Sequence, residues 1–463
     1  MKWIVLSLFI LLGGHALADH PNLYLTPQDI ERGKKNIERY AWAKEFFDGM
    51  KTEADKWAVK SEDEIRGLVP QPKALFAYGF SGCPTCGVTW TTWGNGGLCD
   101  FALPGKVKCT SCGRIFPDAE YPDPGDGWLD PKTGRRHYFV AQYNAFVAQR
   151  LTLDVPANLS NAYAITGDEK YARTAAVVFD ALAKIYPTCT VGSIDYPNHP
   201  GGRFERTQYQ VARVLVLLAN DYDLIYNSPA LDAPSQAGEA TIRKSIEERI
   251  FKNGAAYCFE QGNSGRYGLT NGEADYVRGV LAVGLFLGIQ EYVDWALEGP
   301  YSVFNFLENN LHHDGQYYET SVGYSQHALN LYIDMAEMLA NYRSPKYPNG
   351  INLYTHPKLS KALVQGQLDV ICAGHSPRFG DSGPDVKELG EGNPYLPYMH
   401  LMAERLYRRT DDKAHWARVM NQICGGKVEE WRTNAPAFKV WLMYHVEPLA
   451  GHGQMVKWSN VKP

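Results

Sequence analysis

Apolar residues recur at helical spacing along most of the chain from His137 onward. The segment QVARVLVLLANDYDLIY shows the pattern: its apolar side chains fall three or four residues apart, which places them on one face of a helix. The residues on that face are Val211, Val214, Leu215, Leu218, Tyr222 and Ile225. Strand-like alternation is scarce, so we expect a mainly α protein.

The same periodicity predicts a long series of helices, separated by loops that contain Gly, Pro or Asn. They are expected over residues 142–165, 168–185, 207–227, 238–251, 272–296, 301–311, 325–342, 359–372, 395–409 and 412–423. Many helices in succession without a constant short repeat favour hairpins packed into a large array or ring over a solenoid. Alternate loops would then gather at one end of the ring.

The pattern changes along the chain and predicts five segments. Residues 1–18 form an expected signal peptide, 19–70 charged N-terminal helices, and 71–136 an irregular module rich in Gly, Pro, Cys and Trp. The helical domain is expected over 137–445, and residues 446–463 form a tail that would begin a further β domain.

The first residues have the composition of a secretory signal. Lys2 supplies the positive start, Trp3 to Leu12 an apolar run, and Ala16-Leu17-Ala18 a cleavage site before Asp19. The alternative is a membrane anchor, but the apolar run is too short to span a bilayer. We therefore expect a secreted or periplasmic protein. The net charge of -5 argues against nucleic acid as the main partner.

Four of the nine cysteines are spaced as metal ligands. Cys83, Cys86, Cys109 and Cys112 form C-x2-C-x22-C-x2-C, which suits a tetrahedral Zn²⁺ bound by four thiolates. Four sulfurs fill the coordination shell, so such a zinc would be structural. The alternative is a pair of disulfides, and Cys99 is a substitute ligand. No organic cofactor is expected.

Proton-handling and charged residues concentrate in loops of the helical region. The densest stretch is LHHDGQYYETSVGYSQHA, residues 311–328, with three histidines, three tyrosines and two acids. The other candidates are Asn263, Arg266, Asn271 and Glu273 in NSGRYGLTNGEADYVRG, His375, Arg378, Asp381 and Asp385 in CAGHSPRFGDSGPD, and His199, Arg203 and Arg206 in DYPNHPGGRFERTQYQ. Each stretch also has a non-catalytic interpretation. The first can be a helix cap, the second a polar turn and the third a solvated basic turn.

Several of these stretches, in this order, resemble the heparinase II/III-like polysaccharide lyases and the related alginate lyases. They are YAITGDEKYA, LLANDYDLIY, TNGEADYVRG, DGQYYETSVGYSQHA and HSPRFGDSG, which cover roughly residues 140–385. The resemblance implies an incomplete (α/α) toroid, normally followed by an antiparallel β-sandwich. It also implies β-elimination on an acidic polysaccharide that contains uronic acid.

The resemblance also implies roles for particular residues. It places the family's catalytic tyrosine at Tyr324, its acidic residue at Glu319 and its conserved asparagine at Asn271. His375 is expected as a further catalytic group. The expected substrate-binding residues are Glu319, Arg378, Glu273, Arg266, His199, Arg203, Tyr318 and His327.

The chemistry explains why these residue types suit the reaction. The proton beside the sugar carboxylate is weakly acidic until an amide, arginine or histidine hydrogen-bonds the carboxylate and stabilises the developing enolate. A tyrosine can take this proton, protonate the leaving oxygen, or do both. If a helix has begun before Tyr324, His327 lies on the same side of it. Tyr317 and Tyr318 are either sugar platforms or core aromatics, and His312 and His313 are expected to end the preceding helix.

One family feature has no counterpart here. Relatives usually carry a further catalytic histidine in a His-x-His-x-Asp segment of the β domain, and His452 in AGHGQ does not match it. Two other functions therefore stay open. An inverting glycosidase would use Glu319 with Asp381, or Asp314 with Glu273, as its carboxylate pair. A carbohydrate-binding scaffold would keep the cleft without the chemistry.

Overall fold

The computed structural model describes residues 20–77, 82–88, 90, 97–190, 203–204, 208–265, 268–319, 321–369 and 395–427. Most of them are helical, as the periodicity predicts. The N-terminal helices are α1 (Pro27–Arg39), α2 (Ala41–Ala58) and α3 (Glu62–Leu68). The later helices are α4 (Phe139–Gln149), α5 (Val155–Thr166), α6 (Glu169–Ile185), α7 (Val211–Ile225), α8 (Ile242–Ile246), α9 (Asn253–Asn263), α10 (Asn271–Leu287), α11 (Gln290–Glu298), α12 (Val303–Asn310), α13 (Val322–Asn341), α14 (Pro357–Leu363), α15 (Gln365–Asp369), α16 (Tyr395–Arg409) and α17 (Lys413–Ile423).

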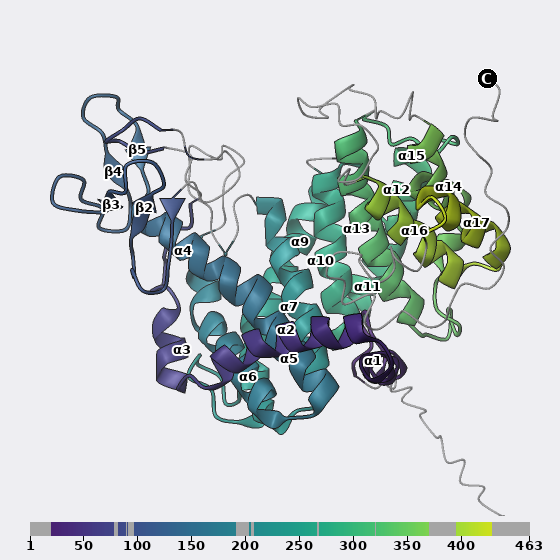
Figure 1. The fold of residues 1–463 in the computed structure, drawn as a ribbon, viewed down its shortest axis with the longest axis horizontal. Coiled ribbons are helices and arrows are strands. Elements are labelled where there is room, and N and C mark those ends of the chain that lie inside the picture. The colour runs from purple at the N-terminus through teal and green to yellow at the C-terminus, as the bar shows by residue number, and fades with distance from the viewer. Residues whose placement is uncertain are drawn as a thin grey trace, which may run out of the picture.

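The helices form an incomplete (α/α) toroid. In one row α5 packs on α7, α7 on α10, and α10 on α13, whereas α6, α9 and α11 pack behind this row. Figure 1 shows the row crossing the middle of the molecule, with α12 to α17 at one end. One apolar core extends from Leu23 to Cys424, so the N-terminal helices share the core of the ring. No helix in the described ranges is both long and apolar enough to cross a membrane.

Some predicted helices are interrupted. The segment expected over 272–296 is two helices, because Gly288 has a φ of 68° and ends α10 in the left-handed conformation. The segment over 142–165 contains a π-helical stretch, Arg150–Asp154, between α4 and α5. A second such stretch, Glu247–Lys252, joins α8 to α9, which continues to Asn263. Residue periodicity alone does not reveal these breaks.

The row contains parallel helices that approach closely. Ala212, near the start of α7, lies where a side chain on Gly279, midway along α10, would stand, 2.7 Å from the position of its Cβ. Near the ends of both helices, the rings of Tyr222 and Phe286 are 5.9 Å apart. The contacts therefore advance in the same direction along the two helices. A side chain at position 279 would push the two helices apart.

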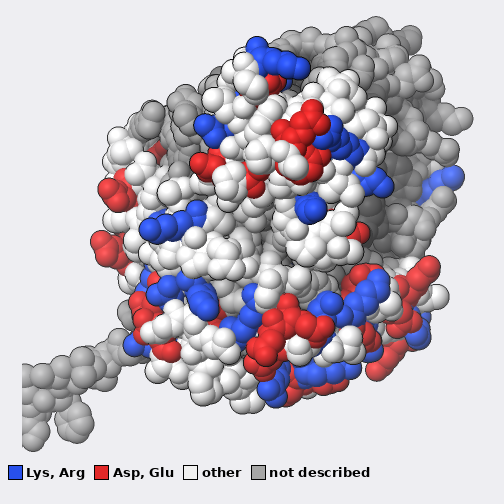
Figure 2. All heavy atoms as spheres, turned by 90° about the vertical axis from the view of Figure 1, so that its left-hand side faces the viewer, with Lys and Arg blue, Asp and Glu red and all other residues white. Residues whose placement is uncertain are grey.

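The Cys-rich segment forms a small module at the other end of the molecule, next to α4 (Figure 1). It has two antiparallel sheets of very short strands: β1 (Gly97–Leu98), β2 (Val107–Cys109) and β3 (Ile115–Phe116), and separately β4 (Trp128–Leu129) and β5 (Arg136–His137). Its own apolar cluster is small and centres on Trp90, Phe116 and Phe139. Figure 2 shows acidic and basic side chains interspersed over the described surface at this end.

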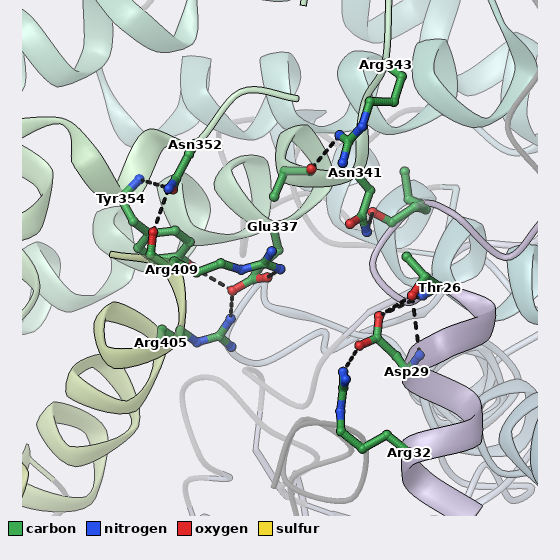
Figure 3. Close-up of polar contacts among 12 residues, drawn as sticks. Thr26, Asp29, Arg32, Glu337, Asn341, Arg343, Asn352, Tyr354, Arg405 and Arg409 are labelled. Atoms are coloured by element: carbon green, nitrogen blue, oxygen red, sulfur yellow. Dashed lines mark hydrogen bonds and ion pairs between the residues drawn. The ribbon is translucent and has the colours of Figure 1, made fainter. Parts of the chain in front are cut away.

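Buried ion pairs connect the end of the ring to the row. Glu337 of α13 accepts hydrogen bonds from Arg405 (2.6 Å), Arg409 (2.7 Å) and the hydroxyl of Tyr354 (2.7 Å), as Figure 3 shows. Burial alone would raise the pKa of Glu337, but the two arginines lower it to about 2. These contacts hold α16 against α13.

The residues just before α1 cross the opposite ends of the row. The carboxylate of Asp223, near the end of α7, pairs with His20 (2.5 Å) and accepts the backbone N–H groups of Asn22 and Leu23, both at 2.8 Å. The Leu23 carbonyl accepts a hydrogen bond from the last residue of α13, Asn341, at 3.4 Å. This N-terminal strap, residues 20–23, therefore joins the ends of α7 and α13.

Candidate active site

The starts of α7, α10 and α13 lie side by side. Arg213, in the first turn of α7, donates from Nε (3.0 Å) and Nη2 (2.9 Å) to one carboxylate oxygen of Asp275 in α10. The same Nη2 lies 3.2 Å from Nε2 of His327 in α13. The N-terminal ends of the three helices therefore face the same end of the ring, where the helix dipoles favour an anion.

Tyr324 lies in the first turn of α13. Its backbone N–H donates to the hydroxyl of Ser321 (3.3 Å), which caps the helix. The helix has begun before Tyr324, so this tyrosine and His327 lie three residues apart on one side of it, as the sequence predicts. Both side chains are partly exposed.

Asn271 lies at the same end of the ring. It is the first residue of α10, whereas the cap position is taken by Thr270, so the non-catalytic interpretation as the cap does not apply to Asn271. The adjacent Gly272 approaches the ring of Tyr209, which would be 3.7 Å from an added Cβ. The guanidinium of Arg213 lies over the same ring, 5.6 Å from its centre. Tyr209 thus connects the start of α10 to Arg213.

A chain of alternating charges runs beneath these residues. Asp275 is fully buried and also accepts a hydrogen bond from Arg278 (2.8 Å), which in turn pairs with Asp334 of α13 (2.5 Å). Burial lowers the pKa of His327, and the positive charge of Arg213 lowers it further, so this histidine is neutral at neutral pH.

Arg213, Asp275 and Arg278 are not among the site residues that the sequence predicts. Each sits in an otherwise apolar helix, and Asp275 and Arg278 are three residues apart. Charged residues on the core side of an apolar helix are rarely buried without partners. The opposite charges of Asp275 and Arg278, three residues apart in an apolar helix, are therefore a signal that could have identified these two residues.

The loop before α13 separates its tyrosines. Leu311 pairs with Tyr317 in a short bridge, and Tyr317 is buried, so it belongs to the core. Tyr318 is exposed, and its hydroxyl donates to Glu319 at 3.1 Å. Burial and the neighbouring carboxylate raise the pKa of Tyr318. Tyr318 and Glu319 therefore form a polar pair at the surface.

The expectation that two histidines end the preceding helix is wrong. Helix α12 ends at Asn310, and His312 and His313 lie beyond it in an exposed turn. The turn reverses at Gly315, where φ is 88°. The bridge between Leu311 and Tyr317 competes with another helical turn and closes the hairpin instead.

A sequence model of one family, alginate lyase, matches residues 130–363, which is half of the chain and contains Asn271, Tyr324 and His327. The chain belongs to the alginate lyase family. It is therefore a member of a polysaccharide lyase family, as its resemblance implies. A search of curated proteins finds no match.

Solved structures of lyases resemble this member of the alginate lyase family at low identity. An alginate lyase from Bacteroides ovatus has a TM-score of 0.47 at 15% identity, covering 92% of this chain and 100% of that one. Alginate lyase A1-III from Sphingomonas species A1 has a TM-score of 0.37 at 14% identity, covering 74% and 78%. Heparinase III has a TM-score of 0.39 at 14% identity, covering 61% and 42%.

Glu273 lies close in sequence to the site but is enclosed. Its side chain is fully buried, and neither carboxylate oxygen has a hydrogen-bond partner among the described residues. A Cβ on Gly262 of α9 would lie 3.6 Å from one of these oxygens. Burial raises the pKa of Glu273 to about 8, so the carboxyl group is largely protonated at neutral pH. A substrate-binding role for Glu273 stays a prediction.

Arg203 lies apart from the contacts described above. It has a φ of 50°, and its guanidinium lies over the rings of Tyr186 (5.6 Å) and Tyr257 (5.2 Å). Its Nε and Nη1 are buried without a hydrogen-bond partner in the described part of the chain. The other predicted groups, His199, Arg206, Arg266, His375, Arg378, Asp381 and Asp385, lie outside the described residues.

The four cysteines of the module meet as their spacing predicts. Their sulfurs all lie within 4.8 Å of one another, with Cys83 and Cys112 at 3.7 Å and Cys86 and Cys109 at 3.8 Å. A disulfide needs about 2.05 Å, so the four thiols are free and the disulfide alternative does not hold. Tetrahedral ligands at about 2.3 Å from a metal stand about 3.8 Å apart, which is close to the spacing of these two pairs. Cys99 is not part of the cluster.

Proposed function

We propose that this protein is an exported lyase that cleaves a uronic-acid-containing polysaccharide by β-elimination. The observation that supports the proposal is that Asn271 begins α10, which packs on α13, while Tyr324 and His327 lie near the start of α13, all within the part of the chain that matches the alginate lyase family. An acidic polymer suits this end of the ring because both the helix dipoles and Arg213 attract anions.

The reaction assigns a separate task to each group. Asn271, the first residue of α10, donates its amide N–H groups to the uronate carboxylate and stabilises the enolate that forms there. Tyr324 removes the proton from C5, and the C4–O4 bond breaks as the C4–C5 double bond forms. The leaving O4 oxygen takes a proton from the tyrosine hydroxyl, which restores the starting state.

Other predicted residues take supporting tasks. We place His375 and Arg378 at the carboxylate as further neutralising groups, with Arg266, His199 and Arg203 as contacts to the polymer. Glu319 orients Tyr318 through their hydrogen bond, and Tyr318 offers an exposed ring to a sugar. Residues 1–18 direct export and are removed before Asp19.

The module would hold a structural Zn²⁺ on Cys83, Cys86, Cys109 and Cys112. The cluster offers four thiolates at tetrahedral spacing, and a complete thiolate shell leaves no open position for a substrate. When bound, the ion would crosslink two turns of the module. No step of the elimination passes through it.

One assay tests the elimination directly. The protein is incubated with alginate, heparan sulfate, chondroitin and hyaluronan, and the ultraviolet absorbance of the unsaturated uronate is followed. A rise on one of them supports the lyase. New reducing ends without this absorbance would indicate an inverting glycosidase, and binding without either signal a scaffold.

The tyrosine is tested by Tyr324→Phe, which keeps the ring and removes the hydroxyl. We expect a fall in kcat of roughly 100-fold or more, because removing a positioned acid or base costs about 10²–10⁴. Tyr342→Phe, at the opposite end of α13, is the matched control. Full activity in Tyr324→Phe would remove the assigned role.

A further inference from the structure

Arg213 lies between a buried carboxylate and a histidine of the site. Two of its nitrogens bind Asp275, whose side chain is fully buried, while its own side chain is a quarter exposed. This double contact fixes the plane of the guanidinium and directs Nη2 toward Nε2 of His327, at 3.2 Å. Asp275 of α10 therefore orients the arginine, and the arginine in turn contacts His327 of α13.

A guanidinium has donors only, which decides the proton on the histidine. Nε2 of His327 must accept the hydrogen bond from Arg213, so it carries no proton. The proton of the neutral ring then sits on Nδ1. Protonating Nε2 would set two N–H groups against each other and place two positive charges in contact.

We propose that Arg213 is a positioning residue, which holds His327 as the neutral Nδ1–H tautomer so that Nδ1–H donates to the substrate carboxylate. This inference rests on the proposed function, since it names how one neutralising group of that site is prepared. Asp275 serves as the anchor that orients Arg213. Tyr324 remains the group that moves the proton.

The charges around His327 come from two neighbouring helices. Arg213 faces it from α7, and Asp275 and Arg278 act on it from α10. Burial is the largest cause of its lowered pKa, the two arginines lower the pKa further, and Asp275 opposes them. Removing Arg213 leaves the burial and Arg278 in place. It also removes the cation that offsets Asp275, so the carboxylate would then favour the protonated imidazolium and raise the pKa of His327.

The first test observes the histidine itself by ¹⁵N NMR, with His327→Gln identifying its signals. In the wild-type protein we expect the Nδ1–H tautomer and a lowered pKa. In Arg213→Met, which keeps the length but not the donors, we expect a mixture of tautomers and a rise in the pKa of His327. Arg213→Lys should restore part of the pKa shift through its charge. An unchanged tautomer and pKa in Arg213→Met would overturn the inference.

The second test uses kinetics on the polymer that the wild-type protein cleaves. We expect Arg213→Met to lower kcat about 10- to 100-fold with a smaller effect on KM. When Arg213→Met is combined with His327→Gln, kcat should fall little further than in His327→Gln alone, because both changes remove the same donor. Losses that multiply in the double variant would overturn the inference. Arg150→Met, in an exposed pair with Asp154, is the matched control.

The two tests separate this inference from the proposed function. If the wild-type protein is inactive on all of the polymers, the proposed function is refuted. The NMR measurement would still decide the tautomer of His327. Measurable lyase activity with an unaltered kcat in Arg213→Met would refute the positioning role alone. Thermal unfolding of each variant shows whether a loss comes from misfolding, and Arg213→Lys provides a second variant that retains the charge.

Discussion

The helical ring and the Cys-rich module are ordered by different means. The ring buries a continuous apolar core that extends from the N-terminal strap to α17. The module has strands of two or three residues and an apolar cluster of six buried side chains. Such a small core cannot offset the entropy of ordering its loops. We therefore expect the module to depend on a metal held by its four cysteines, whereas the ring depends on packing.

The difference predicts that each region can be disrupted while the other survives. The largest effect is expected in Cys109→Ser, or on removal of the metal with a chelator. Binding of a structural zinc contributes roughly 10–16 kcal/mol in small domains, so the module should lose its structure while the ring keeps its helical content. Hydrogen exchange over residues 97–137, with metal analysis, measures this.

Cys99→Ser is the matched control, because Cys99 lies outside the cluster. It should retain one metal per chain and the protection of the module. Equal protection in Cys109→Ser and the wild-type protein would show that packing alone orders the module.

The converse disruption is Phe251→Ala in the helical ring. The phenyl group of Phe251 packs edge-on against Phe286, with 4.7 Å between the ring centroids, and its centroid lies 5.4 Å from that of Tyr222. Its truncation should lower the free energy of unfolding by roughly 3–5 kcal/mol. Denaturant titration followed by circular dichroism measures the loss, and metal content should stay unchanged. Release of the metal from this variant would mean that the two regions are not independent.

A polar contact also supports the ring, at the N-terminal strap. Asp223→Ala leaves His20 and two backbone N–H groups without their acceptor, so we expect a loss of about 3 kcal/mol. Asp48→Ala, which breaks the exposed pair with Lys44, should cost less than about 0.5 kcal/mol. Similar losses in both variants would show that the strap adds nothing beyond a surface pair. Thermal unfolding compares them.

The smallest expected effect concerns the enclosed Glu273. Its pKa rises from 4.5 to about 8 on folding, so the folded state holds a proton that the unfolded state releases between these values. The contribution of the protonated Glu273 to the free energy of unfolding is therefore fully present below about pH 4.5, and it is lost as pH rises toward 8. Glu273→Gln cannot ionise, so we expect its stability relative to the wild-type protein to be about 2 kcal/mol greater at pH 7 than at pH 5.

Denaturant titrations of both proteins at several pH values test this. The difference between the two curves should grow from pH 5 to pH 8. A constant difference over that range would show that Glu273 is ionised in the folded protein.

Much of the architecture follows from local patterns. Helical periodicity predicted the helices of the ring, because residues three or four apart share a face of a helix. The spacing of the two Cys-x-x-Cys pairs predicted the four-cysteine cluster, because each pair can offer two ligands to one metal. The position of Tyr324 and His327 on one helix was likewise predicted by their separation of three residues. The interruptions after Leu287 and at Arg150–Asp154 were not, since the flanking helices share one apolar pattern.

Local sequence patterns are enough to predict a helical protein with a four-cysteine module and a motif that resembles those of lyases. How its charged residues are paired depends on contacts between distant segments of the fold. Glu273 and Asp275 are two residues apart on α10, yet Asp275 is bound by two arginines and Glu273 has no partner in the described structure. Arg213 reaches Asp275 from another helix. The protonation of each carboxyl group depends on such neighbours from distant segments, because burial favours the neutral form and a nearby cation favours the charged one.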